Sequence, residues 1–205
     1  MRTIVYIDGF NLYYGALKRT PYRWLDLGAL CTRLLPRDTI LAIKYYTAPV
    51  RALPHDPQQP QRQQVYLRAL RTIPSLTIHF GHFLVHQVKM PLVEPAGQFA
   101  WVIKSEEKGS DVNLATHLLH DGHRDAYDLA VVISNDSDLA EPIRIARNEL
   151  QKSVGVFTPN REHPSKVLER DATFFKTLRP AAIAASQFQS TLVDAKGTFH
   201  KPVGW

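Results

Sequence analysis

The sequence predicts an α/β fold with a doubly wound sheet of parallel strands. Short apolar runs occur along the chain, and most are continuous rather than alternating, which is typical of parallel strands covered on both faces. Segments with apolar residues at helical spacing lie between these runs. Strands and helices that alternate in this way indicate helices packed on both faces of one parallel sheet.

The expected strands are the apolar runs themselves, at residues 4–7, 41–46, 76–80, 129–133 and 154–157. The expected helices lie at residues 10–17, 26–35, 59–73, 110–120, 139–150 and 166–178. Most of them are assigned from apolar residues that share one face. In the last helix these residues are Leu168, Ala172 and Phe175.

One interval departs from the alternation. Residues 82–104 contain two β-rich stretches joined by the Pro/Gly turn EPAG, which predicts an inserted β-hairpin. We expect its Phe83 and Trp101 to pack on the core; the alternative is that its aromatic residues stack unpaired bases. Residues 1–178 then form one domain, and residues 179–205 form a peripheral C-terminal extension.

The composition of the 205 residues suits one globular domain. Lysine and arginine number 25 against 19 acidic residues, and the net charge of +6 favours a polyanionic partner such as nucleic acid. Cys31 is the only cysteine, which excludes an intrachain disulfide and a cysteine-based zinc site. The N-terminal apolar run is too short for a signal peptide, and no run reaches the roughly 18 residues that span a bilayer. We therefore expect a cytoplasmic protein without membrane contact.

Acidic residues follow the predicted strands. Asp8 ends the first strand, with Asn11 in the first turn of the next helix. Asp136 and Asp138 follow the strand at residues 129–133, and Asp111 lies in the first turn of the helix after the hairpin. Ligands of an open parallel sheet bind beyond the carboxyl ends of its strands, so we expect these side chains at one edge of the sheet.

Two interpretations of these acids remain open. Each acid can cap a helix, where a carboxylate also suits the helix dipole. One cap per helix is enough, however, and residues 134–138 offer more polar groups than a cap needs. Clustered carboxylates repel one another unless a cation compensates them, and Mg²⁺ or Mn²⁺ is a hard cation that takes oxygen ligands. The cluster therefore points to metal-dependent phosphoryl chemistry.

Three motifs follow one another along the chain: D-G-x-N at residues 8–11, K-G-x-D at 108–111 and S-N-D-x-D at 134–138. With the stretches IVYIDGFNLYYG and KGSDVNLATHLLHDGHRDAYDLAVVISNDSDLAEPIRIAR, they resemble the NYN domain family of PIN-like, metal-dependent ribonucleases, in particular its LabA-like bacterial branch. The resemblance covers residues 1–178. It implies a PIN-like, Rossmann-like three-layer α/β/α sandwich around a central parallel sheet.

The resemblance also implies roles for individual residues. The implied metal ligands and catalytic acids are the carboxylates of the motifs, Asp8, Asp111, Asp136 and Asp138. Asn11 would be their polar partner in catalysis and a contact to the substrate. Lys108 would contact the scissile phosphate or be a solvated turn residue, and these two interpretations are equally good. Ser134 and Asn135 would contact the substrate or hold the loop.

The expected function is hydrolysis of phosphodiester bonds in single-stranded RNA by a water that Mg²⁺ or Mn²⁺ activates. The expected partner is then RNA, and a homo-oligomer is compatible with this prediction. The alternative is a regulatory RNA-binding module that keeps the acidic cleft but cleaves RNA weakly or not at all. A nucleotide-sugar glycosyltransferase also places D-x-D after a strand, but Asp8, Asp111 and the chain length count against it. A Rossmann dehydrogenase is disfavoured because no G-x-G-x-x-G follows the first strand.

Overall fold

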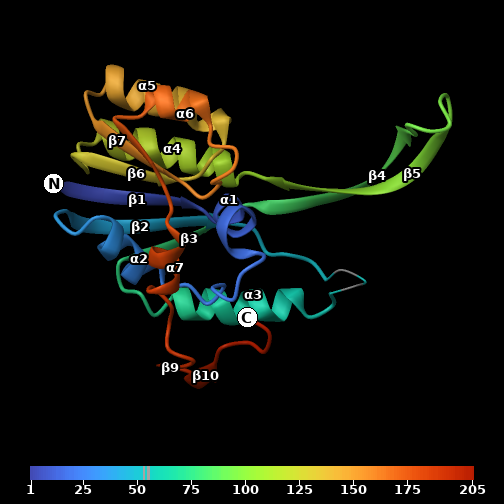
Figure 1. The fold of residues 1–205 in the computed structure, drawn as a ribbon, viewed down its shortest axis with the longest axis horizontal. Helices are drawn as coiled ribbons and strands as arrows, with labels where there is room; N and C mark the ends of the chain where they lie inside the picture. The colour runs from blue at the N-terminus through green and yellow to red at the C-terminus, as the bar shows by residue number, and fades with distance from the viewer. Residues whose placement is uncertain (53, 55) are drawn as a thin grey trace.

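The computed structural model describes residues 1–52, 54 and 56–205 and confirms the α/β fold. Its centre is a six-stranded parallel sheet with the strand order β3-β2-β1-β6-β7-β8 (Figure 1). The strands are β1 (Arg2–Asp8), β2 (Thr39–Thr47), β3 (Leu76–Phe80), β6 (Leu129–Ile133), β7 (Ser153–Thr158) and β8 (Phe174–Thr177). Every residue of β6 is buried, which explains why this central strand is a continuous apolar run.

Helices cover both faces of the sheet (Figure 1). On one face lie α1 (Gly9–Leu12), its π-helical continuation (Tyr13–Leu17), α2 (Leu27–Leu34), α3 (Gln59–Leu70) and α7 (Pro180–Ala184). On the other face lie α4 (Ser110–His123), α5 (Ala140–Asn148) and α6 (Lys166–Asp171). Val5 and Ile7 point into the first core, whereas Ile4 and Tyr6 point into the second, so the fold is a three-layer sandwich. Within the part of the chain that the structure describes, no helix is both long and apolar enough to cross a membrane.

The helix predicted at residues 166–178 is wrong in its second half. α6 ends at Asp171, and the residues after it form β8 at the edge of the sheet, parallel to β7. Phe174 packs in the core of one face of the sheet and Phe175 in the core of the other, which is the alternation of a strand. The ring of Phe174 occupies the space beside Gly155 that a Cβ on that glycine would need.

The inserted hairpin consists of β4 (His82–Pro91) and β5 (Phe99–Lys108), so it extends past residue 104, where we expected it to end. It is a two-stranded sheet of its own and projects from the body as a long arm (Figure 1). Trp101, which we expected on the core, is 70% exposed. At the base of the arm, the ring of Phe83 packs edge-to-face on Phe10, with the ring centroids 5.7 Å apart.

Residues 179–205 were expected to be a peripheral extension. They pack on the face of the sheet that α1, α2 and α3 cover. They include a second hairpin, formed by β9 (Thr191–Asp194) and β10 (Gly197–His200). Ile183 and Phe199 are buried in the core on that face. The buried Trp24 donates a hydrogen bond of 2.9 Å from Nε1 to the carbonyl oxygen of Gln189. This segment therefore contributes to the folded core.

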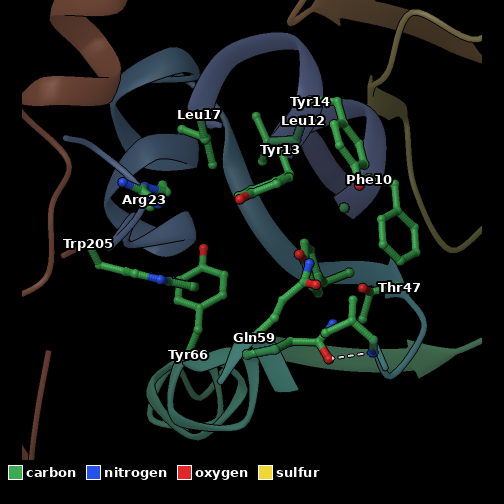
Figure 2. A pocket seen from close by; sticks show the side chains of 14 residues that line it. Phe10, Leu12, Tyr13, Tyr14, Leu17, Arg23, Thr47, Gln59, Tyr66 and Trp205 are labelled. Atoms are coloured by element: carbon green, nitrogen blue, oxygen red, sulfur yellow. Dashed lines mark hydrogen bonds between the residues drawn. The ribbon is translucent and has the colours of Figure 1, made fainter. Parts of the chain in front are cut away.

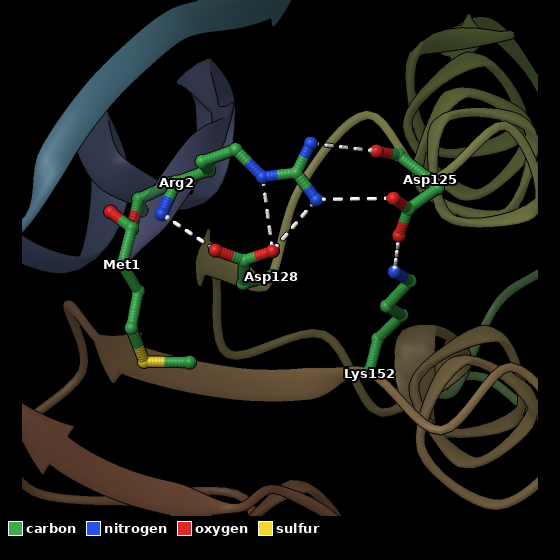
Figure 3. Close-up of polar contacts among 6 residues, drawn as sticks. Met1, Arg2, Asp125, Asp128 and Lys152 are labelled. Atoms are coloured by element: carbon green, nitrogen blue, oxygen red, sulfur yellow. Dashed lines mark hydrogen bonds and ion pairs between the residues drawn. The ribbon is translucent and has the colours of Figure 1, made fainter.

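An ion-pair network joins three segments at the amino ends of the central strands (Figure 3). Arg2 of β1 donates to the Asp128 carboxylate at 3.0 Å from Nε and at 2.7 Å from Nη2, and Nη2 lies 3.1 Å from the Asp125 carboxylate. Lys152, which precedes β7, also pairs with Asp125. The side chains of Arg2, Asp125 and Asp128 are exposed, so their ion pairs contribute little to stability, whereas the side chain of Lys152 is mostly buried. The carboxylates of Asp125 and Asp128 are thus both paired with basic side chains at this edge of the sheet (Figure 3).

The Trp24 contact gives a test of how the C-terminal segment is held. Trp24→Phe removes the hydrogen bond to the carbonyl oxygen of Gln189 and part of the packing around a buried side chain, so we expect the free energy of unfolding to fall by about 2 kcal/mol. Urea denaturation measures the change. Trp101→Phe, the same substitution on the exposed arm, is the matched control and should stay within about 0.5 kcal/mol of the parent. Equal stability of the two variants would contradict this account.

Candidate functional site

The carboxyl ends of β1 and β6 lie side by side at the centre of the sheet. From β1 the chain continues to β2 on one side, and from β6 it continues to β7 on the other. A crevice forms at such a switch point because the two connections leave in opposite directions. Asp8 is the last residue of β1, and Asp136 follows β6 after a short loop. The structure brings both acids to one cavity at this edge.

The first turn of α1 depends on a close approach to β2. A Cβ on Gly9 would lie 2.6 Å from the Tyr45 hydroxyl oxygen and 2.7 Å from the carbonyl oxygen of Tyr46, so only glycine fits. Asp8 caps this turn, because its Oδ1 accepts a hydrogen bond of 2.9 Å from the backbone N–H of Asn11. The D-G-x-N spacing is therefore that of a tight strand-to-helix turn.

Asp8 is a buried acid, with 4% of its surface exposed. Its Oδ2 accepts a hydrogen bond of 2.9 Å from the hydroxyl of Ser134. Burial raises the pKa of Asp8, and the charge of Asp136 raises it further, whereas the hydrogen bonds from Asn11 and Ser134 lower it. The pKa is raised on balance, which shows that two hydrogen bonds do not fully replace the water that Asp8 has lost.

Asp136 and Asp138 occupy different positions. Oδ1 of Asp136 accepts a hydrogen bond of 3.0 Å from the backbone N–H of Asp138 and so caps the single 3₁₀ turn (Ser137–Leu139) before α5. Asp136 also lines the cavity. Asp138 is exposed and lies outside the lining, although its charge contributes to the raised pKa of Asp111. Of this pair, Asp136 is the one placed to meet a ligand.

Asp111 reaches the cavity from the start of α4. Gly109, with a φ of 96°, turns the chain from β5 into this helix in a conformation that a side chain disfavours. The pKa of Asp111 is raised from its ordinary 3.8 to about 6, first by burial and then by the charges of Asp8, Asp136, Glu107 and Asp138. These carboxylates are therefore close enough to repel one another.

Glu107 is the residue of this site that sequence reasoning missed. Its carboxylate accepts hydrogen bonds from the backbone N–H of Ser110 at 3.2 Å and from the Ser110 hydroxyl at 2.7 Å, and it lines the same cavity. A signal was present in the sequence, because a glutamate stands three residues before the serine that begins α4. The hairpin register, which turns Glu107 toward the cavity, is not visible in that spacing.

The polar residues of the motifs hold the loops together. Asn11 lines the cavity, and its Oδ1 accepts a hydrogen bond of 3.0 Å from the backbone N–H of Asn135. Ser134 is buried and bonds both Asp8 and the backbone N–H of Asp136. The side-chain oxygen of Asn135 accepts a hydrogen bond of 2.8 Å from Thr158. Ser134 and Asn135 were expected either to contact the substrate or to hold the loop, and in the structure both bond other parts of the protein.

Lys108, expected either to contact the scissile phosphate or to be a solvated turn residue, lies at the end of β5 and outside the lining of the cavity. Its Nζ is 3.3 Å from the carboxylate of Glu106, and half of its side chain is exposed. This position fits a solvated turn residue better than a residue that contacts the scissile phosphate.

The donor set of the cavity fits a hard divalent cation. The described lining residues are Asp8, Phe10, Asn11, Tyr14, Phe83, Glu107, Ser110, Asp111 and Asp136. Among residues 1–52, 54 and 56–205, no three carboxylate, imidazole or thiol side chains are already arranged to hold a metal ion. Mg²⁺ needs only one or two carboxylates because it keeps several waters. The repulsion that raises the pKa of Asp111 is what such a cation would relieve.

Comparison with known families agrees with the α/β fold described above. The family model of the NYN domain matches residues 2–179, which include the whole sheet and the acidic cavity. The chain belongs to the NYN domain family. The resemblance predicted from the three motifs is confirmed, and the fold is that of the PIN-like nuclease superfamily.

Two further proteins are similar to this NYN chain. A 6-hydroxy-3-succinoylpyridine 3-monooxygenase from Pseudomonas putida is 30% identical over 238 aligned positions, which span all of this chain and 75% of the relative. The crystal structure of a protein of unknown function from Vibrio parahaemolyticus is similar with a TM-score of 0.51 and 16% identity, over 87% of this chain and 93% of that one. The second likeness concerns the fold alone, and the name of the first gives no support to RNA hydrolysis.

The raised pKa of Asp111 predicts that the acidic cavity lowers the stability of the metal-free protein. Between about pH 4 and about pH 6 the unfolded chain loses the Asp111 proton more readily than the folded one, so folding becomes less favourable as the pH rises. Asp111→Asn removes this charge. At about pH 7.5 we expect it to raise the free energy of unfolding by about 1 kcal/mol, allowing for solvent screening of a half-exposed group.

Urea denaturation in the presence of EDTA measures this gain, which should disappear at about pH 4 because the parent is then protonated as well. Asp38→Asn makes the same change at the opposite edge of the sheet, where the carboxylate pairs with the N-terminal amine, and should lower the stability by no more than about 1 kcal/mol. A loss of stability in Asp111→Asn at neutral pH would show that the carboxylates do not repel one another.

Proposed function

We propose that this NYN protein is a ribonuclease that hydrolyses phosphodiester bonds of single-stranded RNA and depends on Mg²⁺ or Mn²⁺. The observation that carries the proposal is the acidic cavity at the switch point, where Asp8, Asp111 and Asp136 meet from three separate segments. Family membership supports it, because the fold is that of PIN-like nucleases.

Each residue of the cavity would have a distinct role. Asp111 and Asp136 would hold the cation, which supplies Lewis acidity and charge compensation at the phosphate when it is bound. Both oxygens of Asp8 already accept hydrogen bonds, so Asp8 would act by its charge or through water. Asn11 holds the backbone of the loop that carries Asp136 and is a positioning residue. Asp138 would add negative charge from outside the cavity.

The arm offers a path for the RNA strand. By the register of the hairpin, Phe83 and Glu107, which line the cavity, share one side of the ribbon with Lys89, Phe99 and Trp101. The Nζ of Lys89 lies 5.4 Å from the ring centroid of Phe99. Exposed aromatic rings next to a cation suit unpaired bases next to a phosphate backbone. The net charge of +6 adds an attraction that does not depend on RNA sequence.

The decisive variant is Asp136→Asn, which keeps the shape of the side chain and removes its charge. We expect Mn²⁺-dependent cleavage of an end-labelled single-stranded RNA to fall at least about 100-fold, because a cation ligand is lost. RNA affinity, measured by filter binding in EDTA so that the parent does not cleave the RNA, should change less than about threefold because base stacking and backbone contacts remain.

Asp38→Asn is the matched control and should cleave at the parent's rate. RNA binding by the parent without cleavage in Mg²⁺ or Mn²⁺ would favour the regulatory RNA-binding module instead. Cleavage that survives in Asp8→Asn, in Asp136→Asn and in EDTA alike would overturn the nuclease proposal.

A second candidate function is oxygenation of a small aromatic compound. Two observations favour it: the Pseudomonas putida relative is named a monooxygenase, and an aromatic cavity adjoins the acidic one and shares Phe10 and Tyr14 with it. A monooxygenase also needs an electron donor, and no G-x-G-x-x-G segment for a dinucleotide follows β1. Oxygen uptake with 6-hydroxy-3-succinoylpyridine and a reduced nicotinamide tests this function. We expect none above the rate without protein, and substrate-dependent uptake would replace the nuclease proposal.

A further inference from the structure

A second cavity lies beside the acidic one and has a different chemistry. It is enclosed by the π-helical turn after α1, the end of β2, the start of α3 and Trp205 (Figure 2). The cavity has a volume of about 70 Å³ and is partly open to solvent, so only part of a ligand would lie inside it. Phe10 and Tyr14 line both cavities.

Aromatic rings form much of the wall. Besides Phe10 and Tyr14, the lining includes Tyr13, Tyr66 and Trp205. The ring centroids of Tyr66 and Trp205 lie 5.5 Å apart, so the two rings pack on each other at one end of the cavity. Flat, apolar walls of this kind favour a planar aromatic ligand, because such a ring buries its faces against them.

Arg23 is the one charged residue among the described residues that line this cavity. Figure 2 places it beside Trp205 and Tyr66. Its Nε is buried and has no hydrogen-bond partner within the described part of the chain. A buried guanidinium donor without an acceptor is unfavourable, and an anionic oxygen of a ligand would supply the acceptor.

Two of the neighbouring polar side chains, those of Gln63 and Tyr66, are already engaged. Gln63 donates to the carbonyl oxygen of Ala48 and accepts from the backbone N–H of Val50, both at 2.9 Å. The hydroxyl of Tyr66 donates to the carbonyl oxygen of Leu25 at 2.8 Å. Arg23 is the group in this wall that can select a ligand by charge, because the other described lining residues have uncharged side chains.

We propose that this cavity binds a planar aromatic ring that carries an anionic group, with the ring against Tyr66 and Trp205 and the anion at Arg23. Two classes of compound combine such a ring with an anionic group: mononucleotides and small aromatic carboxylates. The site is separate from the proposed ribonuclease activity, because its occupation requires neither a cation in the acidic cavity nor cleavage of RNA.

Calorimetric titration of the full chain in EDTA tests the site with two matched pairs of probes. Uridine 5′-monophosphate is compared with uridine, and nicotinate with nicotinamide. At least one anionic probe should bind about tenfold more tightly than its neutral counterpart. Tighter binding of the mononucleotide would assign the ligand to nucleotides, tighter binding of nicotinate would assign it to small aromatic acids, and either result supports the site.

Two variants connect the binding to this cavity. Arg23→Gln should abolish the preference for the anionic probe, whereas Arg37→Gln, on the exposed turn before β2, should keep it. Trp205→Ala should weaken the charged and the neutral probe alike by about tenfold because a wall of the ring site is lost, and Trp101→Ala on the arm should not. Thermal melts check that each variant is folded. If Arg23→Gln does not fold, Trp205→Ala alone tests whether the probes bind in this cavity.

Failure of both anionic probes to bind at about 1 mM would overturn the proposal. Equal affinity for the charged and neutral members of both pairs would overturn it as well. So would binding that Arg23→Gln and Trp205→Ala leave unchanged. Loss of RNA cleavage in Asp136→Asn has no bearing on these measurements, so the two proposals fail or stand independently.

Discussion

The burial of one carboxylate, that of Asp8 at the end of the central strand, organises both the fold and the candidate site. A buried anion is tolerated only when hydrogen bonds replace its water, and here the donors are the backbone N–H of Asn11 and the hydroxyl of Ser134. One donor belongs to α1 and the other to the loop after β6, so the two sides of the switch point are joined through Asp8. The two groups that donate hydrogen bonds to Asp8 therefore also fix the positions of the two chain segments that border the crevice.

Acidic side chains are paired with basic ones at one end of the sheet and are clustered with other acids at the other end. At the amino ends of the strands, Arg2 and Lys152 pair with the nearby aspartates. At the carboxyl ends, acids gather and raise the pKa of Asp111 instead. Charges that disfavour the folded state are retained where function needs them, and elsewhere a fold selected for stability pairs its charges. This contrast supports the carboxyl edge as the proposed functional end independently of any motif.

Sequence reasoning recovered the parallel sheet because its central strands are buried on both faces and therefore appear as continuous apolar runs. It failed at residues 166–178, where Phe174 and Phe175 suit a helix face as well as a strand that packs on two cores. It grouped Asp8, Asp111 and Asp136 because strand ends can be located from local patterns. The roles of Glu107 and Trp101 could not be predicted, because they depend on the hairpin register and on how far the arm projects. The aromatic cavity was missed because Arg23, Tyr66 and Trp205 lie far apart in sequence.

The position of Trp205 has a consequence for dynamics. It closes one end of the aromatic cavity but follows residues without regular secondary structure, and it is held by packing against Tyr66 and Trp24. Short segments held in this way open at a free energy well below that of global unfolding. Exchange of the proposed ligand with solvent would then require only that the segment carrying Trp205 lift from α3, while the strands that carry the acids stay in place. Access to the aromatic cavity would thereby be kinetically uncoupled from the rigidity of the acidic one.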